Sequence, residues 1–310
     1  MKHLSAPTLL ATFALGLLTA SAHADPTVYV TNLFQQFGTV SLTTGVFSPI
    51  GPGTPEAGQG LVMGLGGSLL TLTTAGNLSA INPTTGIQTV VGPTGLGDCS
   101  LSTSPCGPNS AGALTSLGGK LYATDFGNNL YTVDPLTGIA TLIGATGIPP
   151  VPIIPFSMNP DGSTNLFDES LFSAGGSLYE TFDVFSFATD GYTKSFAVAP
   201  GLYKIDPLTG IGSLQSAASP QILSATNIGG VIYVFQGGLD AANPFPGFQT
   251  LGTLNLATGN VTTLLNLDAS TGPIFGIVEG PSPVPEPSSL ALLGTGLAAL
   301  AAKIRRARNR

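Results

Sequence analysis

The side chains that could do acid–base or metal chemistry in this sequence are almost all carboxylates. Between Asp25 and Glu286 the chain holds all sixteen acidic residues, three lysines, no arginine and no histidine. The two histidines, His3 and His23, lie near the N-terminus. Catalysis would have to use carboxylate pairs, lysine or tyrosine. The sequence therefore predicts neither histidine-dependent catalysis nor a zinc site.

The densest acidic stretch consists of Asp168, Glu169, Glu180, Asp183 and Asp190. Such carboxylates could bind a hard cation or form a solvated acidic rim, and the rim is the default interpretation. Asp161 lies in a second candidate, residues 159–165, which has oxygen ligands at alternate positions but lacks the closing bidentate glutamate of a calcium loop. Calcium is thus the one cofactor that the sequence suggests, with Asp161, Asp168 and Glu169 as candidate ligands.

The only two cysteines, Cys99 and Cys106, enclose six residues. An isolated pair in a chain that carries export signals, described below, favours a disulfide that closes this loop. Metal binding by the pair is disfavoured because no further soft ligand is present.

The residues from Asp25 to Glu286 carry a net charge of −13, because three lysines oppose sixteen acids. A body this acidic is repelled by phosphate backbones and anionic lipid headgroups, which argues against nucleic-acid binding. Only 8% of the whole chain is charged, whereas 43% is hydrophobic and 42 residues are glycine. This composition is typical of a turn-rich all-β protein.

A recurring turn motif predicts how the chain is organised. Asp134–Gly138 reads Asp-Pro-Leu-Thr-Gly, and Asp206–Gly210 repeats it. Asn82–Gly86 has an amide in place of the acid, and Leu42–Gly45 and Leu256–Gly259 are looser copies. Asp or Asn bonds to its own backbone, proline fixes φ, and glycine accepts the positive φ that reverses the chain. Each copy lies between β-patterned runs and predicts a hairpin. For Asp134 and Asp206 we therefore expect a turn role and not a catalytic one.

The spacing of these hairpins predicts a β-propeller. Their glycines lie at positions 45, 86, 138, 210 and 259, at least 41 residues apart, which fits four-stranded blades. Segments that resemble blade-opening strands are 61–65, 113–117, 171–174, 222–228 and 274–278. The last opens no blade, and the first unit, from Val28, lacks an opening strand. We therefore predict five blades over residues 25–280, with the strand at 274–278 pairing antiparallel with the strand containing Tyr29.

Four insertions interrupt these units, at residues 92–110, 144–165, 185–200 and 237–249. We expect them to be long loops on a rigid scaffold, which is where binding residues usually lie. Drift in loop length explains any one of them equally well.

Two segments carry a family resemblance. Val28–Asn32 followed by Gly38–Gly45 resembles the YVTN type of β-propeller repeat, and Lys120–Asp125 with the Asp134 hairpin resembles another copy. The similarity spans most of Thr27–Glu279. It implies the propeller fold and an extracytoplasmic setting, and it supplies no catalytic residues.

The N-terminus resembles a secretory signal peptide. A basic start at Lys2 is followed by an apolar run from Leu9 to Ala20 and by the small-residue sequence Ala22-His23-Ala24. This order predicts that residues 1–24 are removed on export.

The C-terminus resembles the PEP-CTERM sorting signal. Pro285, Glu286 and Pro287 end a proline-rich linker (281–287), and residues 288–310 hold an apolar run at 290–302 and a basic tail formed by Lys303, Arg305, Arg306, Arg308 and Arg310. The thirteen apolar residues predict a short helix of about 20 Å. This is shorter than the hydrocarbon core of about 30 Å, so a transient anchor is favoured. An ordinary single-span anchor is the alternative.

Together these signals predict an exported protein that passes through an inner-membrane intermediate and reaches the cell surface or the extracellular matrix. The resemblance implies an exosortase-like sorting enzyme as a partner, and the body would then bind or scaffold exopolysaccharide or surface proteins. The alternative is a propeller enzyme, a polysaccharide lyase or a lactone or ester hydrolase, that uses carboxylates or a bound divalent cation.

Overall fold

The computed structural model describes residues 26–97, 109–148, 164–187, 194–218, 221–240, 243–268 and 271–280. These residues form β-strands, turns and one short 3-10 helix, η1 (Leu65–Gly67). Thr27–Gly280 forms one compact unit. The all-β prediction is confirmed. The predicted C-terminal apolar helix lies outside the described residues.

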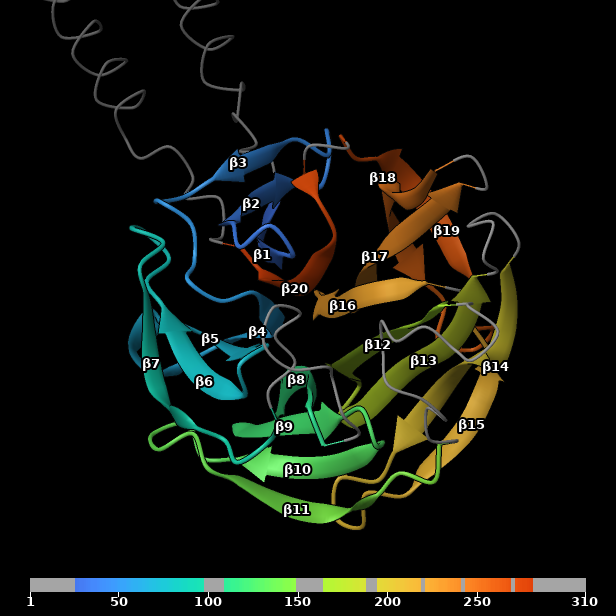
Figure 1. Cartoon of the computed structure of the whole chain (residues 1–310), viewed down its shortest axis with the longest axis horizontal. Coiled ribbons are helices and arrows are strands. Elements are labelled where there is room, and N and C mark those ends of the chain that lie inside the picture. The colour runs from blue at the N-terminus through green and yellow to red at the C-terminus, as the bar shows by residue number, and fades with distance from the viewer. Residues whose placement is uncertain are drawn as a thin grey trace, which may run out of the picture. The chain divides into compact units, whose positions relative to one another are not determined.

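Five antiparallel sheets of four strands each form blades around a central axis (Figure 1). Blade 1 consists of β20 (Ile274–Glu279), β1 (Thr27–Asn32), β2 (Phe37–Ser41) and β3 (Phe47–Pro49). Blade 2 consists of β4 (Gly58–Met63), β5 (Leu69–Thr73), β6 (Asn77–Ile81) and β7 (Gln88–Pro93). Blade 3 consists of β8 (Ala111–Leu117), β9 (Lys120–Asp125), β10 (Asn129–Val133) and β11 (Ala140–Ala145). Blade 4 consists of β12 (Thr164–Ala174), β13 (Ser177–Phe187), β14 (Lys194–Ile205) and β15 (Gly212–Ala217). Blade 5 consists of β16 (Ile222–Ile228), β17 (Val231–Asp240), β18 (Asn243–Leu254) and β19 (Val261–Asn266). The five-blade prediction is confirmed.

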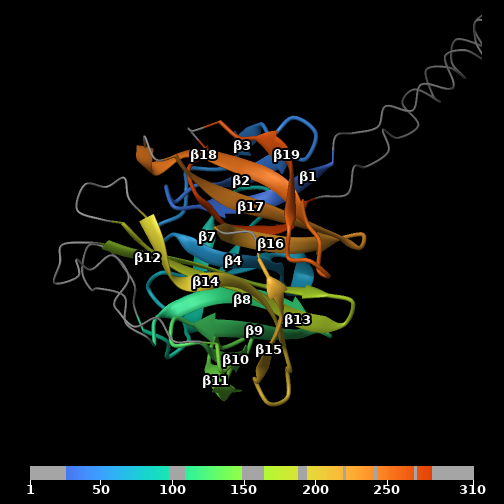
Figure 2. The same ribbon diagram turned by 90° about the vertical axis from the view of Figure 1, so that its right-hand side faces the viewer.

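Two of the expected loops are in large part strand. The insertion at 185–200 lengthens β13 and β14, with Phe185 paired to Phe196, and the insertion at 237–249 lengthens β17 and β18. The expectation of long loops was wrong there, because both halves of each insertion continue the same antiparallel ladder. Pro244 and Pro246 fit because β19 pairs only with residues 250–254 of β18, which leaves one side of the strand without a ladder. The ends of β12, β14 and β18 project beyond the ring on the same side (Figure 2).

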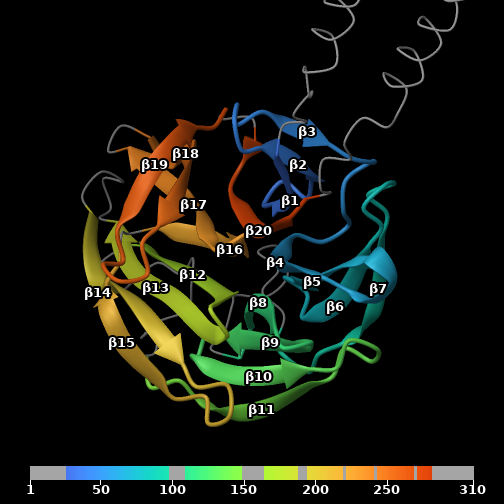
Figure 3. The ribbon, with the colours of Figure 1, turned by 180° about the vertical axis from the view of Figure 1, so that it is seen from behind.

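The last strand closes the ring. β20 pairs antiparallel with β1, with Tyr29 opposite Val278 and Val30 opposite Ile277. Seen from behind, β20 lies between β1 and the axis (Figure 3). This confirms the predicted closure, in which the end of the chain supplies the strand that the first blade lacks. Closure removes the edges that an open array would expose.

The repeated hairpins also join neighbouring blades. Gly138 has φ +82°, and a Cβ placed on it would lie 2.6 Å from the carbonyl oxygen of Gly92 in the preceding blade. One residue of the motif thus meets a turn requirement and a close backbone approach. Backbone hydrogen bonds also join neighbouring blades. Ala140 N of blade 3 donates to Thr94 O, just after blade 2, at 3.0 Å, and Gly212 N of blade 4 donates to Thr146 O, just after blade 3, at 2.7 Å. The motif therefore sets both the hairpin and the docking of blade on blade.

The hydrophobic core lies between adjacent blades, so most strands are buried on both faces. The blade 2–3 interface contains Leu70, Leu72, Leu78, Leu114, Leu121 and Val133 among its buried residues. The blade 3–4 interface contains Tyr122, Leu130, Leu171, Leu178, Phe182 and Ile205. These two interfaces have the same architecture, and they differ in the polar groups that they enclose.

Candidate functional site

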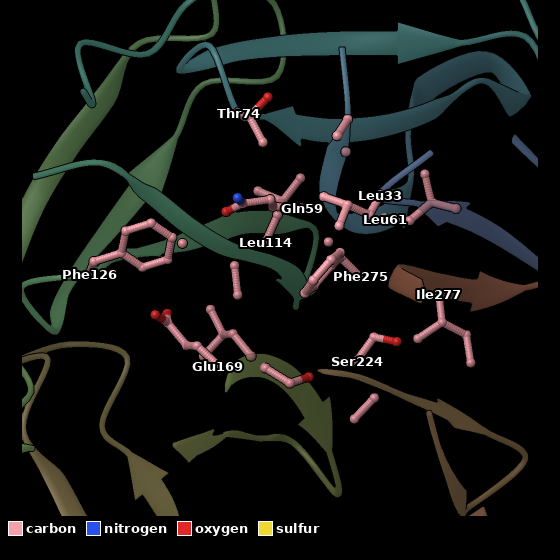
Figure 4. A pocket seen from close by; sticks show the side chains of 18 residues that line it. Leu33, Gln59, Leu61, Thr74, Leu114, Phe126, Glu169, Ser224, Phe275 and Ile277 are labelled. Atoms are coloured by element: carbon pink, nitrogen blue, oxygen red, sulfur yellow. The ribbon is translucent and has the colours of Figure 1, made fainter. Parts of the chain in front are cut away.

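A narrow cavity of about 90 Å³ lies on the axis, lined by residues from the innermost strand of every blade. Its wall is mainly apolar, and its polar side chains include Gln59, Ser224 and Glu169. Figure 4 shows Phe126 and Glu169 on one side of the cavity and Leu61 and Ile277 on the other. A water molecule needs roughly 10–15 Å³ of such volume. The cavity therefore has room for a few water molecules.

Two of the polar side chains in the cavity wall donate hydrogen bonds to neighbouring backbone carbonyl groups. Ser224 Oγ donates to the carbonyl oxygen of Ile274 at 3.0 Å. The Gln59 amide, oriented so that its nitrogen donates, bonds to the carbonyl oxygens of Ala111 and Gly112, each at 2.6 Å. These groups stabilise contacts between the innermost strands. Glu169 is the acidic residue of the wall.

Glu169 lies on β12 and is 8% exposed. Thr124 of blade 3 donates its hydroxyl to Oε1, whereas Oε2 is buried without a hydrogen-bond partner in the described structure. Gly112 makes room for the carboxyl group, because a Cβ there would lie 2.7 Å from Oε1. Burial raises the pKa of Glu169 to about 8, the Thr124 hydrogen bond lowers it, and the charge of Asp125 raises it. The carboxyl group is therefore mostly protonated at neutral pH.

Glu180 lies beside Glu169 in the same sheet. On β13 it is opposite Leu171, which is two residues from Glu169 on β12. Residues two apart in a strand point to the same face, so both glutamates face the blade 3–4 interface. Glu180 is 0% exposed, and neither of its carboxyl oxygens has a hydrogen-bond partner among the described residues. Burial, and then the charges of Glu169 and Asp125, raise the pKa of Glu180 well above its usual range.

Asp125 ends β9 and is also fully buried, but its carboxylate is well supplied with donors. The backbone N–H of Asn129 donates at 2.9 Å, the Asn129 side-chain amide donates to both oxygens, and Tyr131 Oη donates at 2.7 Å. Burial, followed by this hydrogen bond and the Asp125 charge, raises the pKa of Tyr131. On β14, Tyr203 lies opposite Glu180, and burial together with the Glu180 charge raises its pKa.

The structure corrects one prediction about the acidic stretch. Glu169 and Glu180 are buried, so the solvated rim was wrong for these two residues. The cause is that both faces of β12 and β13 pack against a neighbouring blade. Asp168 lies in β12 and Asp183 in β13, and only their backbone is described. No described group of three or more His, Cys, Asp or Glu side chains is arranged to hold a metal ion.

Several predicted site residues lie outside the described residues. These are Asp161, Asp190, Cys99, Cys106, the proline-flanked Glu286 and the basic tail. The disulfide and any calcium loop at 159–165 therefore remain predictions.

Asp134 and Asp206 have the turn role expected of them. The backbone N–H of Leu136 donates to Asp134 Oδ1 at 2.8 Å, and that of Leu208 donates to Asp206 Oδ1 at 2.9 Å. These backbone hydrogen bonds are the main cause that lowers the pKa of each carboxyl group. Both residues are exposed on the hairpins.

A family model decides the nature of the C-terminus. Residues 283–306 match the PEP-CTERM protein-sorting motif. The chain carries a PEP-CTERM signal. The match covers Pro285, Glu286, Pro287 and the tail as far as Arg306, as the sequence predicted. The signal marks an exported protein that passes through the membrane and is recognised by an exosortase-like enzyme.

The propeller is similar to several solved structures at low sequence identity. A protein of unknown function from Bacteroides thetaiotaomicron VPI-5482 aligns over 78% of this chain and 56% of its own length, with 15% identity and a TM-score of 0.43. A streptogramin B lyase aligns over 78% and 65%, with 14% identity and a TM-score of 0.33. A protein of unknown function from Bacteroides caccae aligns over 82% and 98%, with 12% identity and a TM-score of 0.40. The chain thus spans less than two thirds of the first two.

No curated protein matches the sequence significantly. Within the part of the chain that the structure describes, no helix is long and apolar enough to cross a membrane.

Proposed function

We propose that the PEP-CTERM signal delivers the propeller to the cell surface or the extracellular matrix, where it acts as a binding or scaffold protein. The observation that carries this proposal is the position of the motif. The compact propeller unit ends at Gly280, and the sorting motif begins at residue 283. Cleavage within the motif would leave β20, which closes the ring, in place. The folded body can therefore be released whole.

Sorting would proceed through a membrane-bound intermediate. The apolar run at 290–302 is shorter than the length that a helix needs to cross the hydrocarbon core. The basic tail after it would stay on the cytoplasmic side. Both features support a transient anchor that an exosortase-like enzyme removes.

The ligand of the mature protein would contact outer surfaces of the ring. The axial cavity of about 90 Å³ has room for a few waters and not for a sugar chain. The projecting ends of β12, β14 and β18 lie on one side of the ring (Figure 2) and extend its surface there. The net charge of −13 for residues 25–286 favours a neutral partner such as exopolysaccharide, or a cationic surface protein.

A second candidate function is supported by Glu169. Its carboxyl group lines the axial cavity, and burial raises its pKa to about 8, which suits a general acid or base near neutral pH. On this alternative the propeller would be a polysaccharide lyase or a lactone or ester hydrolase, and its substrate would have to enter through a widened cavity.

Fractionation of the producing cells tests the first proposal. We expect the wild-type protein to reach the medium or outer surface without its C-terminal tail, as mapped by mass spectrometry of its C-terminal peptide. A Glu286→Ala variant should remain in the inner membrane with Arg310 intact. Glu279→Ala is the matched control, since Glu279 is exposed at the end of β20 outside the motif. Normal sorting of Glu286→Ala would contradict the proposal.

The protein recovered from the surface then separates the two candidate functions. Binding to the exopolysaccharide of the producing cells without turnover supports the scaffold function. Chain cleavage or hydrolysis of small lactones or esters, lost in Glu169→Gln, supports the enzyme.

A further inference from the structure

Glu169 and Glu180 place two buried carboxyl groups on one face of blade 4. Three of their four oxygens, Glu169 Oε2 and both oxygens of Glu180, are buried and have no hydrogen-bond partner in the described structure. Buried polar groups in native proteins are almost always paired, and an unpaired buried carboxyl group is costly. Three such oxygens on neighbouring residues indicate that the interface has a partner for them.

Among the residues whose side chains are described, no lysine or arginine is buried beside the pair. The interface around the two residues contains Tyr122, Leu130, Leu171 and Phe182. The nearby charged group that acts on both glutamates is the carboxylate of Asp125, which raises the pKa of each. Lys120 and Lys204, the lysines of the body whose side chains are described, are exposed. Tyr203 and Thr124 are the remaining polar neighbours from β14 and β9. Once the two glutamates lose their protons, an external cation could therefore supply the positive charge that the described neighbours lack.

We propose that Glu169 and Glu180 form a buried binding site for a divalent hard cation, Ca²⁺, at the blade 3–4 interface. The carboxylate oxygens of the two residues are the protein ligands, and water from the axial cavity completes the coordination. Glu169 lines that cavity, so the ion would reach the pair from the cavity side. The proposal depends on neither candidate function.

The donor set favours calcium over other divalent metals. Zinc prefers nitrogen and sulfur ligands, and none is present at this pair. Magnesium requires near-ideal octahedral geometry, whereas calcium accepts irregular sets of six to eight oxygens. Two carboxylates neutralise one divalent ion. With only two carboxylate residues, the affinity should lie in the range of extracellular calcium modules, with a Kd of about 10⁻⁴–10⁻³ M.

Calcium binding should be stronger at pH 8 than at pH 5, because both carboxyl groups must lose their protons to bind the ion. The groups that face the pair are Thr124 on β9 and Tyr203 on β14, with Asp125 acting through its charge. None of these is basic, and the Glu169→Gln and Glu180→Gln variants measure how much of the pH dependence comes from the two glutamates.

The test uses the purified full-length protein, Ca²⁺ alone as the probe, and two readouts: isothermal titration calorimetry and the thermal unfolding midpoint. At a Ca²⁺ concentration 100-fold above Kd, we expect the midpoint to rise by about 5 °C or more at pH 8, and by much less at pH 5. Glu180→Gln and Glu169→Gln should each remain folded and lose most of this rise. Glu279→Gln removes an exposed glutamate outside the pair and should keep all of it.

The wild-type titration decides the matter even if one variant fails to fold. Absence of heat and of any midpoint shift up to about 10 mM Ca²⁺, which is at least about tenfold above the expected Kd, would overturn the proposal. It would equally be overturned if both glutamine variants bound calcium like the wild type. Stabilisation of these variants in EDTA without any calcium response of the wild type would indicate a pair that is held by protons alone.

Discussion

The two interfaces on either side of blade 3 have the same architecture and different contents. On one side, the blade 2–3 interface is aliphatic, with Leu72 and Leu78 fully buried. On the other side, the blade 3–4 interface has the same type of apolar frame, with Leu178 fully buried, but it also encloses Glu169 and Glu180. The repeat therefore determines the frame and not its contents. Residues that differ from this apolar frame, such as Glu169 and Glu180, are therefore the ones expected to give this propeller properties of its own.

The largest expected effect comes from removing one leucine from each interface. Leu78→Ala and Leu178→Ala should each lower the free energy of unfolding by about 2–5 kcal/mol, because both residues are fully buried and each substitution leaves a cavity. The two should differ in pH dependence. Leu178 and Glu180 point to the same face of β13, so a cavity at Leu178 would admit water to the carboxyl group and offset part of the loss at high pH.

Urea unfolding at pH 5 and pH 8 in EDTA measures this difference. The loss should be the same at both values for Leu78→Ala and smaller at pH 8 for Leu178→Ala. Equal losses for both variants at both values would mean that the two interfaces respond alike.

The wild-type protein should become less stable as the pH rises. The pKa of Glu169 lies at about 8 in the folded protein against 4.5 for an ordinary glutamate, so between these values the folded state binds more protons than the unfolded state. The free energy of unfolding should then fall by about 1.4 kcal/mol per pH unit for each such group across this window, and level off above it. Unfolding in EDTA from pH 4.5 to 9 measures the slope.

Glu169→Gln is the control for this slope, because the amide does not titrate in the window. The variant should lose part of the slope, and the remainder should belong to Glu180. A wild-type stability that rises from pH 5 to pH 8 would contradict the assignment of raised pKa values to this pair.

Replacing Glu180 by an apolar residue of similar length should make the two interfaces more alike. We expect Glu180→Met to raise the free energy of unfolding by about 1–3 kcal/mol at pH 8 in EDTA, since a buried carboxyl group without a hydrogen-bond partner can often be exchanged for a packed apolar side chain with a gain. The gain should be smaller at pH 5 than at pH 8, because burial raises the pKa of this carboxyl group and its protonation becomes more complete as the pH falls. Glu279→Met, at an exposed position, should change stability by less than about 0.5 kcal/mol. Destabilisation by Glu180→Met at pH 8 would show that the glutamate makes a contact that methionine cannot.

The fold could be predicted from the sequence because turn motifs and strand patterns are local signals. Turn chemistry at Asp134–Gly138 and its relatives defines the hairpins, and the unpaired β20 pattern defines the closure, which the pairing of Tyr29 with Val278 confirms. The docking of Gly138 on Gly92 could not be read from the sequence. This contact joins two blades, and the sequence near either glycine does not indicate which residue of the other blade it will meet.

The acidic pair was missed for a related reason. Glu169 shares a strand face with Leu171, and Glu180 shares one with Phe182, a spacing that could have indicated burial. However, Phe172 on the opposite face of β12 is also buried. A strand that is buried on both faces has no polar alternation against which a buried acid would stand out. The expected loops at 185–200 and 237–249 were wrong because strand extension depends on both halves of an insertion matching in register.

The smallest expected effect compares the hairpins themselves. Blades 3 and 4 use Asp134 and Asp206 as acceptors, whereas Asn82 and Asn255 accept the same backbone hydrogen bonds in blades 2 and 5, as from Thr84 N to Asn82 Oδ1 at 2.9 Å. Asp134→Asn should therefore keep the turn and leave the thermal midpoint unchanged at pH 7. Asp134→Ala removes the acceptor and should lower the midpoint by about 1–2 °C.

Unfolding at acidic pH should distinguish Asp134→Asn from the wild type. The backbone hydrogen bond from Leu136 lowers the pKa of Asp134 in the folded protein, so the stabilisation is present above the unfolded pKa and is lost as the pH falls through the folded value. Asparagine does not titrate and should keep its hydrogen bond in acid. Thermal unfolding from pH 7 to pH 3 should thus show a smaller acid loss for Asp134→Asn than for the wild type. An acid loss of equal size would mean that the charge of Asp134 contributes nothing to the hairpin beyond what the amide supplies.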